Sequence, residues 1–204
     1  MPRPLKGEFD LGQCRWLAFQ YLKLGPFLPR QDASTGEEMP AFQEVRCVDH
    51  SADEMFDLVA DVERYHEFVP LCLRHAILSR ESRPDGEILM TDMMVQCGLY
   101  RESYISRVAL DRAKRRILVE ASDGPLRELR TQWTFQPRAD RSCEVGFYLH
   151  YELASPTLAL LMGAILDVAF GRFVQAFERR ADNVYGRRHK RSSCSPRKIS
   201  VSFS

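Results

Sequence analysis

The side chains that most often carry catalysis or bind metals are dispersed along this sequence. Histidines occur at His50, His66, His75, His150 and His189, and cysteines at Cys14, Cys47, Cys72, Cys97, Cys143 and Cys194. The sequence contains no CxxC pair, so the cysteines predict neither a thiolate zinc site nor a disulfide framework. It also contains no Gly-rich phosphate loop and no recognisable nucleophile with a base beside it. We therefore expect a protein that is not an enzyme and that uses no metal and no cofactor.

The stretch "LVADVERYHEFVPLC", residues 58–72, brings two aromatic side chains close to a proline. Tyr65 and Phe68 share one helical turn, and Pro70 fixes the direction of the chain that follows. In most proteins buried aromatic residues simply fill the core, and that remains one interpretation. As a group, however, these two aromatic residues with Val69, Pro70 and Leu71 form a candidate gate. Val69 and Leu71 would then lie near solvent, where apolar side chains can meet a membrane or a lipid tail.

The elements around this corner are predicted from capping signals and from alternation. Ser51, with Glu54 three residues later, forms a capping box that starts a helix over 52–62. A second helical turn over 62–68 must end before the proline, because the residue preceding a proline is pushed out of the helical region. The predicted strands cover 42–48, 74–82, 87–100, 101–111, 115–122, 126–137 and 142–155. Short turns join the last six, which is typical of an antiparallel meander.

A long helix is predicted over 156–185, with Ser155 as its cap and Gly186 after its end. At about 1.5 Å per residue it is roughly 45 Å long, enough to cross a small domain. Its apolar side needs an apolar partner, and the inner face of the sheet is the only large one. The predicted fold class is therefore α+β, a helix-grip arrangement in which a curved antiparallel sheet wraps around the long C-terminal helix.

A single helix cannot fill the whole concavity of a strongly curved sheet, so we predict a cavity between them, of roughly 300–1,000 Å³. Strand alternation and the helix period point five side chains into it: Tyr104, Trp133, Phe135, Phe147 and Phe173. Met93 joins them from a cluster of methionines on one strand, Met90, Met93 and Met94. The flexible thioether of Met93 suits a cavity whose shape changes, although gap filling in an ordinary core is the alternative. Glu102 shares the parity of Tyr104 and would point a carboxylate inward, unless it forms an ion pair at the edge of the sheet.

Charge is nearly balanced, with 29 Lys and Arg against 28 Asp and Glu, so no general field favours DNA or an anionic membrane. Residues 187–198 are the exception, with six basic and no acidic side chains. We expect 187–204 to be a basic disordered tail, with docking on lipid or RNA as the alternative.

Residues 1–38 are predicted to be a loosely ordered N-terminal extension, and residues 39–186 to form one domain.

Four motifs in this domain belong together. They are "LVADVERYHEFVPLC" (58–72), "RESYISRV" (101–108), the "DGP" turn (123–125) followed by "LRTQWTF" (129–135), and "FVQAFERRADNVYG" (173–186). In this combination, residues 39–186 resemble the coenzyme Q-binding START-domain family, the helix-grip proteins also described as polyketide cyclase-like. The resemblance implies a START-like domain that binds a lipid or a quinone.

The same resemblance implies a function in cellular respiration. The expected ligand is ubiquinone or a related polyprenyl lipid, carried as an accessory protein of respiratory electron transport. The expected location is cytoplasmic, with peripheral contact at the inner membrane, or on the matrix side of the mitochondrion in a eukaryote. A bacterial relative in this family is described as a ribosome-association toxin, so a ribosome-associated interaction protein is the alternative, and a cyclase-like enzyme is a third hypothesis.

Overall fold

The computed structural model describes residues 41–97, 100–187 and 197–199. The strands are β1 (Ala41–Val48), β2 (Cys72–Arg83), β3 (Gly86–Cys97), β4 (Tyr100–Asp111), β5 (Arg116–Ala121), β6 (Leu126–Pro137), β7 (Cys143–Leu153) and β8 (Arg197–Ile199). The helices are α2 (Ala52–Ala60) and α3 (Pro156–Tyr185), with short 3₁₀ helices η1 (Val62–Glu67) and η2 (Ala139–Arg141). The predicted extension 1–38 lies outside the described residues.

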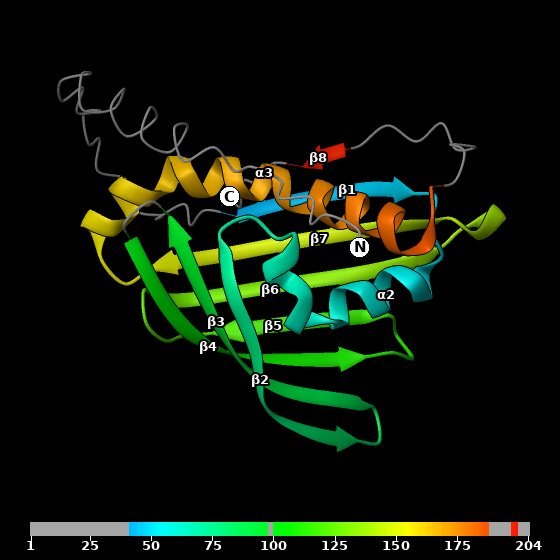
Figure 1. Ribbon diagram of the computed structural model, residues 1–204, viewed down its shortest axis with the longest axis horizontal. Coiled ribbons are helices and arrows are strands. Elements are labelled where there is room, and N and C mark those ends of the chain that lie inside the picture. The colour runs from blue at the N-terminus through cyan, green and yellow to red at the C-terminus, as the bar shows by residue number, and fades with distance from the viewer. Residues whose placement is uncertain (1–40, 98–99, 188–196, 200–204) are drawn as a thin grey trace, which may run out of the picture.

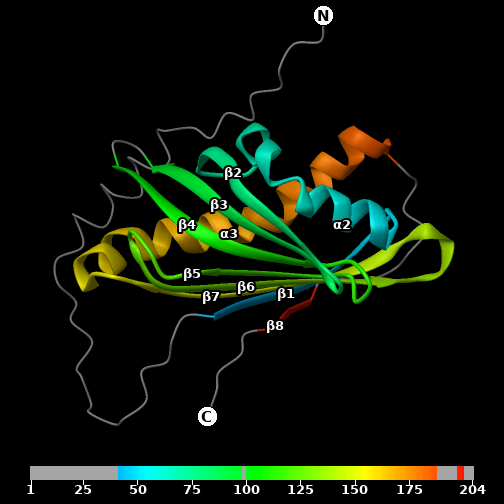
Figure 2. The same cartoon turned by 90° about the horizontal axis from the view of Figure 1, so that it is seen from below.

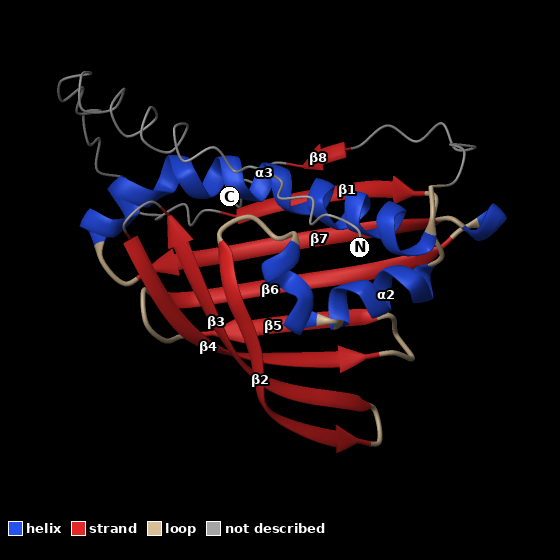
Figure 3. Ribbon diagram, in the orientation of Figure 1, coloured by secondary structure: helices blue, strands red, loops and turns tan. Residues whose placement is uncertain are grey.

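The strands form one antiparallel sheet in the order β2-β3-β4-β5-β6-β7-β1-β8 (Figure 1). Strands β2 to β7 are the predicted meander, and β1 joins its far edge beside β7. Both helices lie on the same side of the sheet, with α3 along its concave face (Figure 2; Figure 3 separates helices from strands by colour). The predicted α+β helix-grip fold is confirmed.

Residues 197–199 depart from the predicted disordered tail. They form β8, which pairs antiparallel with Gln43–Val45 of β1. The open edge of β1 presents unpaired backbone N–H and C=O groups, and a short extended segment satisfies some of them. The rest of the predicted tail, apart from Arg187, lies outside the described residues.

Local signals explain how α2 begins and where it ends. The backbone N–H of Glu54 donates to Ser51 Oγ at 3.3 Å, and the N–H of Ser51 donates to Glu54 Oε2 at 2.8 Å, which is the predicted capping box. The helix ends at Ala60, and η1 continues the chain to Glu67. Ser155, in contrast, makes no side-chain capping bond to α3, although Pro156 occupies the first helical position as predicted.

The C-terminal half of α3 packs on the sheet and on η1 through Phe177, whose side chain is 1% exposed. Its ring centroid lies 5.2 Å from Tyr65, and 5.0 Å from both Phe68 and Trp133. Val184, two helical turns beyond Phe177, is 51% exposed. Ala181 and Tyr185, one and two helical turns beyond Phe177, take the inward positions instead.

Polar contacts fix the same half of α3 to three other elements. His50, after β1, lies 2.9 Å from Asp182, and the hydroxyl of Tyr185 donates to the backbone carbonyl of Glu54 in α2 at 3.1 Å. Arg180 donates to Glu67 of η1 at 2.6 Å. Because His50 is 1% exposed, its partner on α3 relieves part of the cost of burying a polar ring.

The cysteines differ in state. Cys47 is disulfide-bonded, which the spacing of the cysteines did not predict. Cys72, Cys97 and Cys143 form no disulfide bond. Burial raises the pKa of the Cys72 and Cys143 thiols to about 12, so both are uncharged at neutral pH.

Over the described residues, no helix is long and apolar enough to cross a membrane.

The first testable prediction concerns the contact between α3 and the sheet. Phe177→Ala should lower the free energy of unfolding by about 3–5 kcal/mol, because it removes a buried ring and leaves a hole. The matched control is Val184→Ala on the exposed side of the same helix, which should change stability by less than about 0.5 kcal/mol. Urea unfolding of both variants measures this, and equal losses would contradict the packing described here.

Candidate functional site

A cavity of about 170 Å³ lies between α3 and the concave face of the sheet. It is smaller than the predicted volume, because aromatic side chains occupy much of the concavity. Eight of the predicted site residues line it: Tyr65, Pro70, Leu71, Met93, Tyr104, Trp133, Phe147 and Phe173. These side chains come from η1, the turn before β2, four strands (β3, β4, β6 and β7) and α3, so segments far apart in the sequence build one site.

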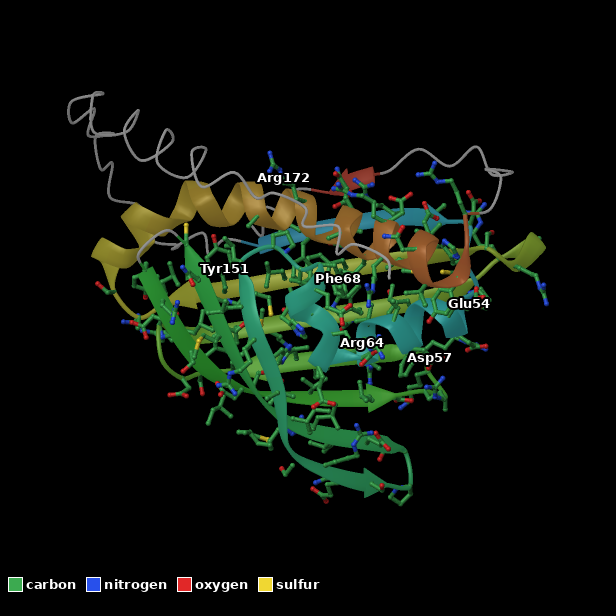
Figure 4. All side chains as sticks on the ribbon, viewed as in Figure 1. Glu54, Asp57, Arg64, Phe68, Tyr151 and Arg172 are labelled. Atoms are coloured by element: carbon green, nitrogen blue, oxygen red, sulfur yellow. The ribbon has the colours of Figure 1, made fainter. Side chains whose placement is uncertain are left out.

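Three predicted residues do not line the cavity. Phe135 is fully buried, with its ring 5.8 Å from Phe56, so it belongs to the core beneath α2. Val69 is only 5% exposed, and the prediction that it lies near solvent is wrong. Its backbone N–H donates to the carbonyl of Tyr65 at 2.8 Å, which turns the side chain inward. Phe68 follows η1 directly (labelled in Figure 4) and is half-buried, packed against α3.

Leu71 is half-buried at this corner and lines the cavity. Its φ of 64° lies in the left-handed region, which is unusual for a residue with a Cβ. The strand beside it stabilises this conformation, since the N–H of Gln96 donates to the carbonyl of Leu71 at 2.9 Å. Pro70 and Leu71 line the cavity at this corner, and Pro125 of the β5–β6 turn and Leu126, the first residue of β6, line it too; we name these four residues the rim.

One wall of the cavity is aromatic. The rings of Trp133 and Phe147 lie 4.5 Å apart, and those of Phe147 and Phe173 lie 5.6 Å apart and nearly parallel. Tyr151, labelled in Figure 4, continues this wall along β7, whereas Arg172 points away from the sheet on the outer side of α3. Stacked and tilted rings of this kind present flat apolar faces, which suit a planar or isoprenoid ligand.

The opposite wall, on β2 to β4, carries polar side chains that the sequence analysis missed. His75 Nε2 lies 2.9 Å from Thr91 Oγ1, which lies 2.8 Å from Ser106 Oγ. His75 and Ser106 line the cavity, and all three side chains are buried. Burial lowers the pKa of His75 to about 4, so its ring is neutral near pH 7. Buried hydroxyls and a neutral imidazole can bond a ligand that has polar oxygens.

Two tyrosine hydroxyls also face this interior. The hydroxyl of Tyr65 donates to the backbone carbonyl of Val59 at 2.5 Å, and that of Tyr104 donates to Met93 Sδ at 3.0 Å. Burial raises the pKa of both phenols, so both remain protonated hydrogen-bond donors. Glu102, the predicted inward carboxylate, is exposed instead. Among the described residues, no group of three His, Cys, Asp or Glu side chains could hold a metal ion.

Some missed residues left a signal in the sequence. Leu149 and Tyr151 alternate along β7 in step with Phe147 and also line the cavity. The period of two that predicted Phe147 therefore also predicts Leu149 and Tyr151. Ala169 lies one helical turn before Phe173 and also lines the cavity. His75 left no such signal, because its role depends on pairing with β3.

This geometry, a concave antiparallel sheet closed by one long helix over an apolar cavity, defines the START-like helix-grip class. Residues 48–178 match the family model described as "Polyketide cyclase / dehydrase and lipid transport". The chain belongs to this family, and the resemblance stated from its motifs is confirmed.

Relatives in the family have different names. The ribosome association toxin RatA of Escherichia coli strain K12 is 31% identical over 150 residues, which cover 74% of this chain and 92% of the relative. The mitochondrial coenzyme Q-binding protein COQ10 of Dictyostelium discoideum is 30% identical over 139 residues, 67% of this chain and 66% of the relative. Among solved structures, the Zhui aromatase/cyclase of a Streptomyces species superposes with a TM-score of 0.60 at 16% identity, over 71% of this chain and 94% of that one. This last similarity shows the fold alone.

The second prediction concerns His75 and pH. The unfolded chain protonates this ring near its ordinary pKa of about 6.5, and the folded chain only near pH 4. Between these values the unfolded state binds more protons, so stability should fall as the pH is lowered from 6.5 towards 4, by about 1.4 kcal/mol per pH unit at most. His75→Gln cannot titrate and should flatten this part of the curve. Urea unfolding at several pH values measures it, and equal slopes would contradict the buried neutral ring.

Proposed function

We propose that this protein binds ubiquinone or a related polyprenyl lipid in the cavity between α3 and the sheet, and acts as an accessory carrier for respiratory electron transport. The observation that carries the proposal is the cavity itself, which has an aromatic wall, a few buried polar groups and an apolar rim. The named binding of coenzyme Q by a relative supports the choice of ligand.

The size of the cavity fits this ligand in one orientation. An apolar cavity of about 150 Å³ holds benzene, so one of about 170 Å³ has room for a single ring. An isoprenoid tail must then pass over the rim at Pro70, Leu71 and Leu126. In the proposed function this rim delivers the lipid to a bilayer through peripheral contact, without a membrane span.

We propose binding without covalent chemistry. The polar side chains that line the cavity are hydroxyls, the amide of Gln96, the thiol of Cys97 and one neutral imidazole, which can orient a ligand but include no carboxylate that could act as a general base. The ligand should therefore be recovered unchanged in mass, whereas a cyclase-like enzyme would convert its substrate.

The second candidate function is association with the ribosome, because the similarity to this chain covers 92% of the length of RatA. Co-sedimentation with ribosomal subunits tests this candidate. An interaction through the outer surface would not need the cavity, so the two functions respond differently to a side chain that fills it.

The third prediction uses Ala169, which lies on α3 with 3% exposure and faces the cavity. Ala169→Phe should place a ring where the ligand ring would sit. We expect protein purified without detergent to contain quinone or polyprenyl lipid by mass spectrometry of its organic extract, and this variant to lose most of that lipid while remaining folded.

Val184→Phe is the matched control, since it adds the same ring to the exposed side of the same helix and should retain the lipid. Equal lipid in both variants would overturn the cavity as the binding site. Lipid-free wild-type protein that sediments with ribosomal subunits would favour the second candidate.

A further inference from the structure

Tyr104 and Met93 stand directly opposite each other in the β3–β4 register, and both line the cavity. The hydroxyl of Tyr104 donates to Met93 Sδ at 3.0 Å. A thioether sulfur is a weak acceptor, so this hydroxyl has exchanged water for a poor partner. A buried hydroxyl gains stability when an oxygen acceptor replaces such a partner.

Tyr65 shows the contrast within the same cavity. Its hydroxyl is satisfied by a backbone carbonyl, that of Val59, at 2.5 Å. That bond joins η1 to α2 and serves the fold. The hydroxyl of Tyr104 makes its bond to the end of a flexible side chain, which can move aside at small cost.

We propose that Tyr104 determines the specificity of the cavity for ring ligands that carry a carbonyl oxygen: its hydroxyl leaves Met93 Sδ and donates a hydrogen bond to that oxygen. This inference rests on the proposed function and adds which ligand group is recognised and by which residue. The displaced methionine side chain then packs on the ring, and the rings of Trp133 and Phe147 contact its other face.

The position of Tyr104 also orients the ligand. It lies four residues after Tyr100, the first residue of β4, which corresponds to about 14 Å along the strand. Tyr100 and Cys97 line the cavity at that end of the β3–β4 hairpin. A ring bonded to Tyr104 is therefore inside the domain, and its tail runs out towards this end.

The test compares two ligands and two variants. The ligands are a short-tailed ubiquinone and an analogue with the same tail on a methylbenzene ring without oxygen. Tyr104→Phe should weaken binding of the quinone about fivefold, the size of one net hydrogen bond, and should leave binding of the oxygen-free analogue unchanged. Tyr148→Phe, which removes a hydroxyl from the opposite face of β7, should change neither.

A second measurement needs no variant. The Met93 methyl signal, labelled with ¹³C, should shift with the quinone more than with the oxygen-free analogue, since only the quinone takes the hydrogen bond from its sulfur. If Tyr104→Phe binds both ligands as wild type does, and the methyl shift is the same for both, this inference is overturned while the proposed function stands. If wild-type protein binds neither ligand, both are overturned.

Discussion

The packing of one straight helix against a curved sheet is the constraint on which this structure depends. Phe177 fills the concavity where α3 meets η1, and the rings of Tyr65, Phe68 and Trp133 around it close that end. About two helical turns before Phe177, the inward residue is Ala169, whose small side chain leaves space between the helix and the sheet. The cavity is therefore a consequence of where large and small residues fall along a single helix.

Polar groups inside this cavity must find partners, because no bulk water compensates them. The structure satisfies most of them within the protein: His75 bonds Thr91, Thr91 bonds Ser106, and Tyr65 bonds a backbone carbonyl. Tyr104 is bonded only to a sulfur atom in the contacts described above. Nδ1 of the buried His75, which also lines the cavity, has no hydrogen-bond partner. The hydroxyl of Tyr104 and this nitrogen are therefore two places where the cavity could bond a polar group of a ligand.

The fold could be predicted from the sequence because its signals are local. The capping box at Ser51 and the alternation around Phe147 each depend on residues close in the chain. The burial of Val69 could not be predicted in this way, since it depends on a backbone turn in which its N–H bonds the carbonyl of Tyr65. Phe135 lies on the same face of β6 as Trp133, yet α2 covers it. Which helix covers a strand residue depends on tertiary packing and could not be predicted from alternation. The contact between His75 and Thr91 depends on strand register for the same reason.

The central claim is that a quinone ring enters the cavity beside Trp133. Of the two tryptophans in the chain, the other is Trp16, so Trp16→Phe leaves Trp133 as the only one. Because a quinone quenches tryptophan fluorescence on close contact, titration of this variant with a short-tailed ubiquinone tests the claim directly. Saturable quenching at one quinone per chain is the predicted result. Fluorescence that does not change, or that falls without saturation, would contradict it.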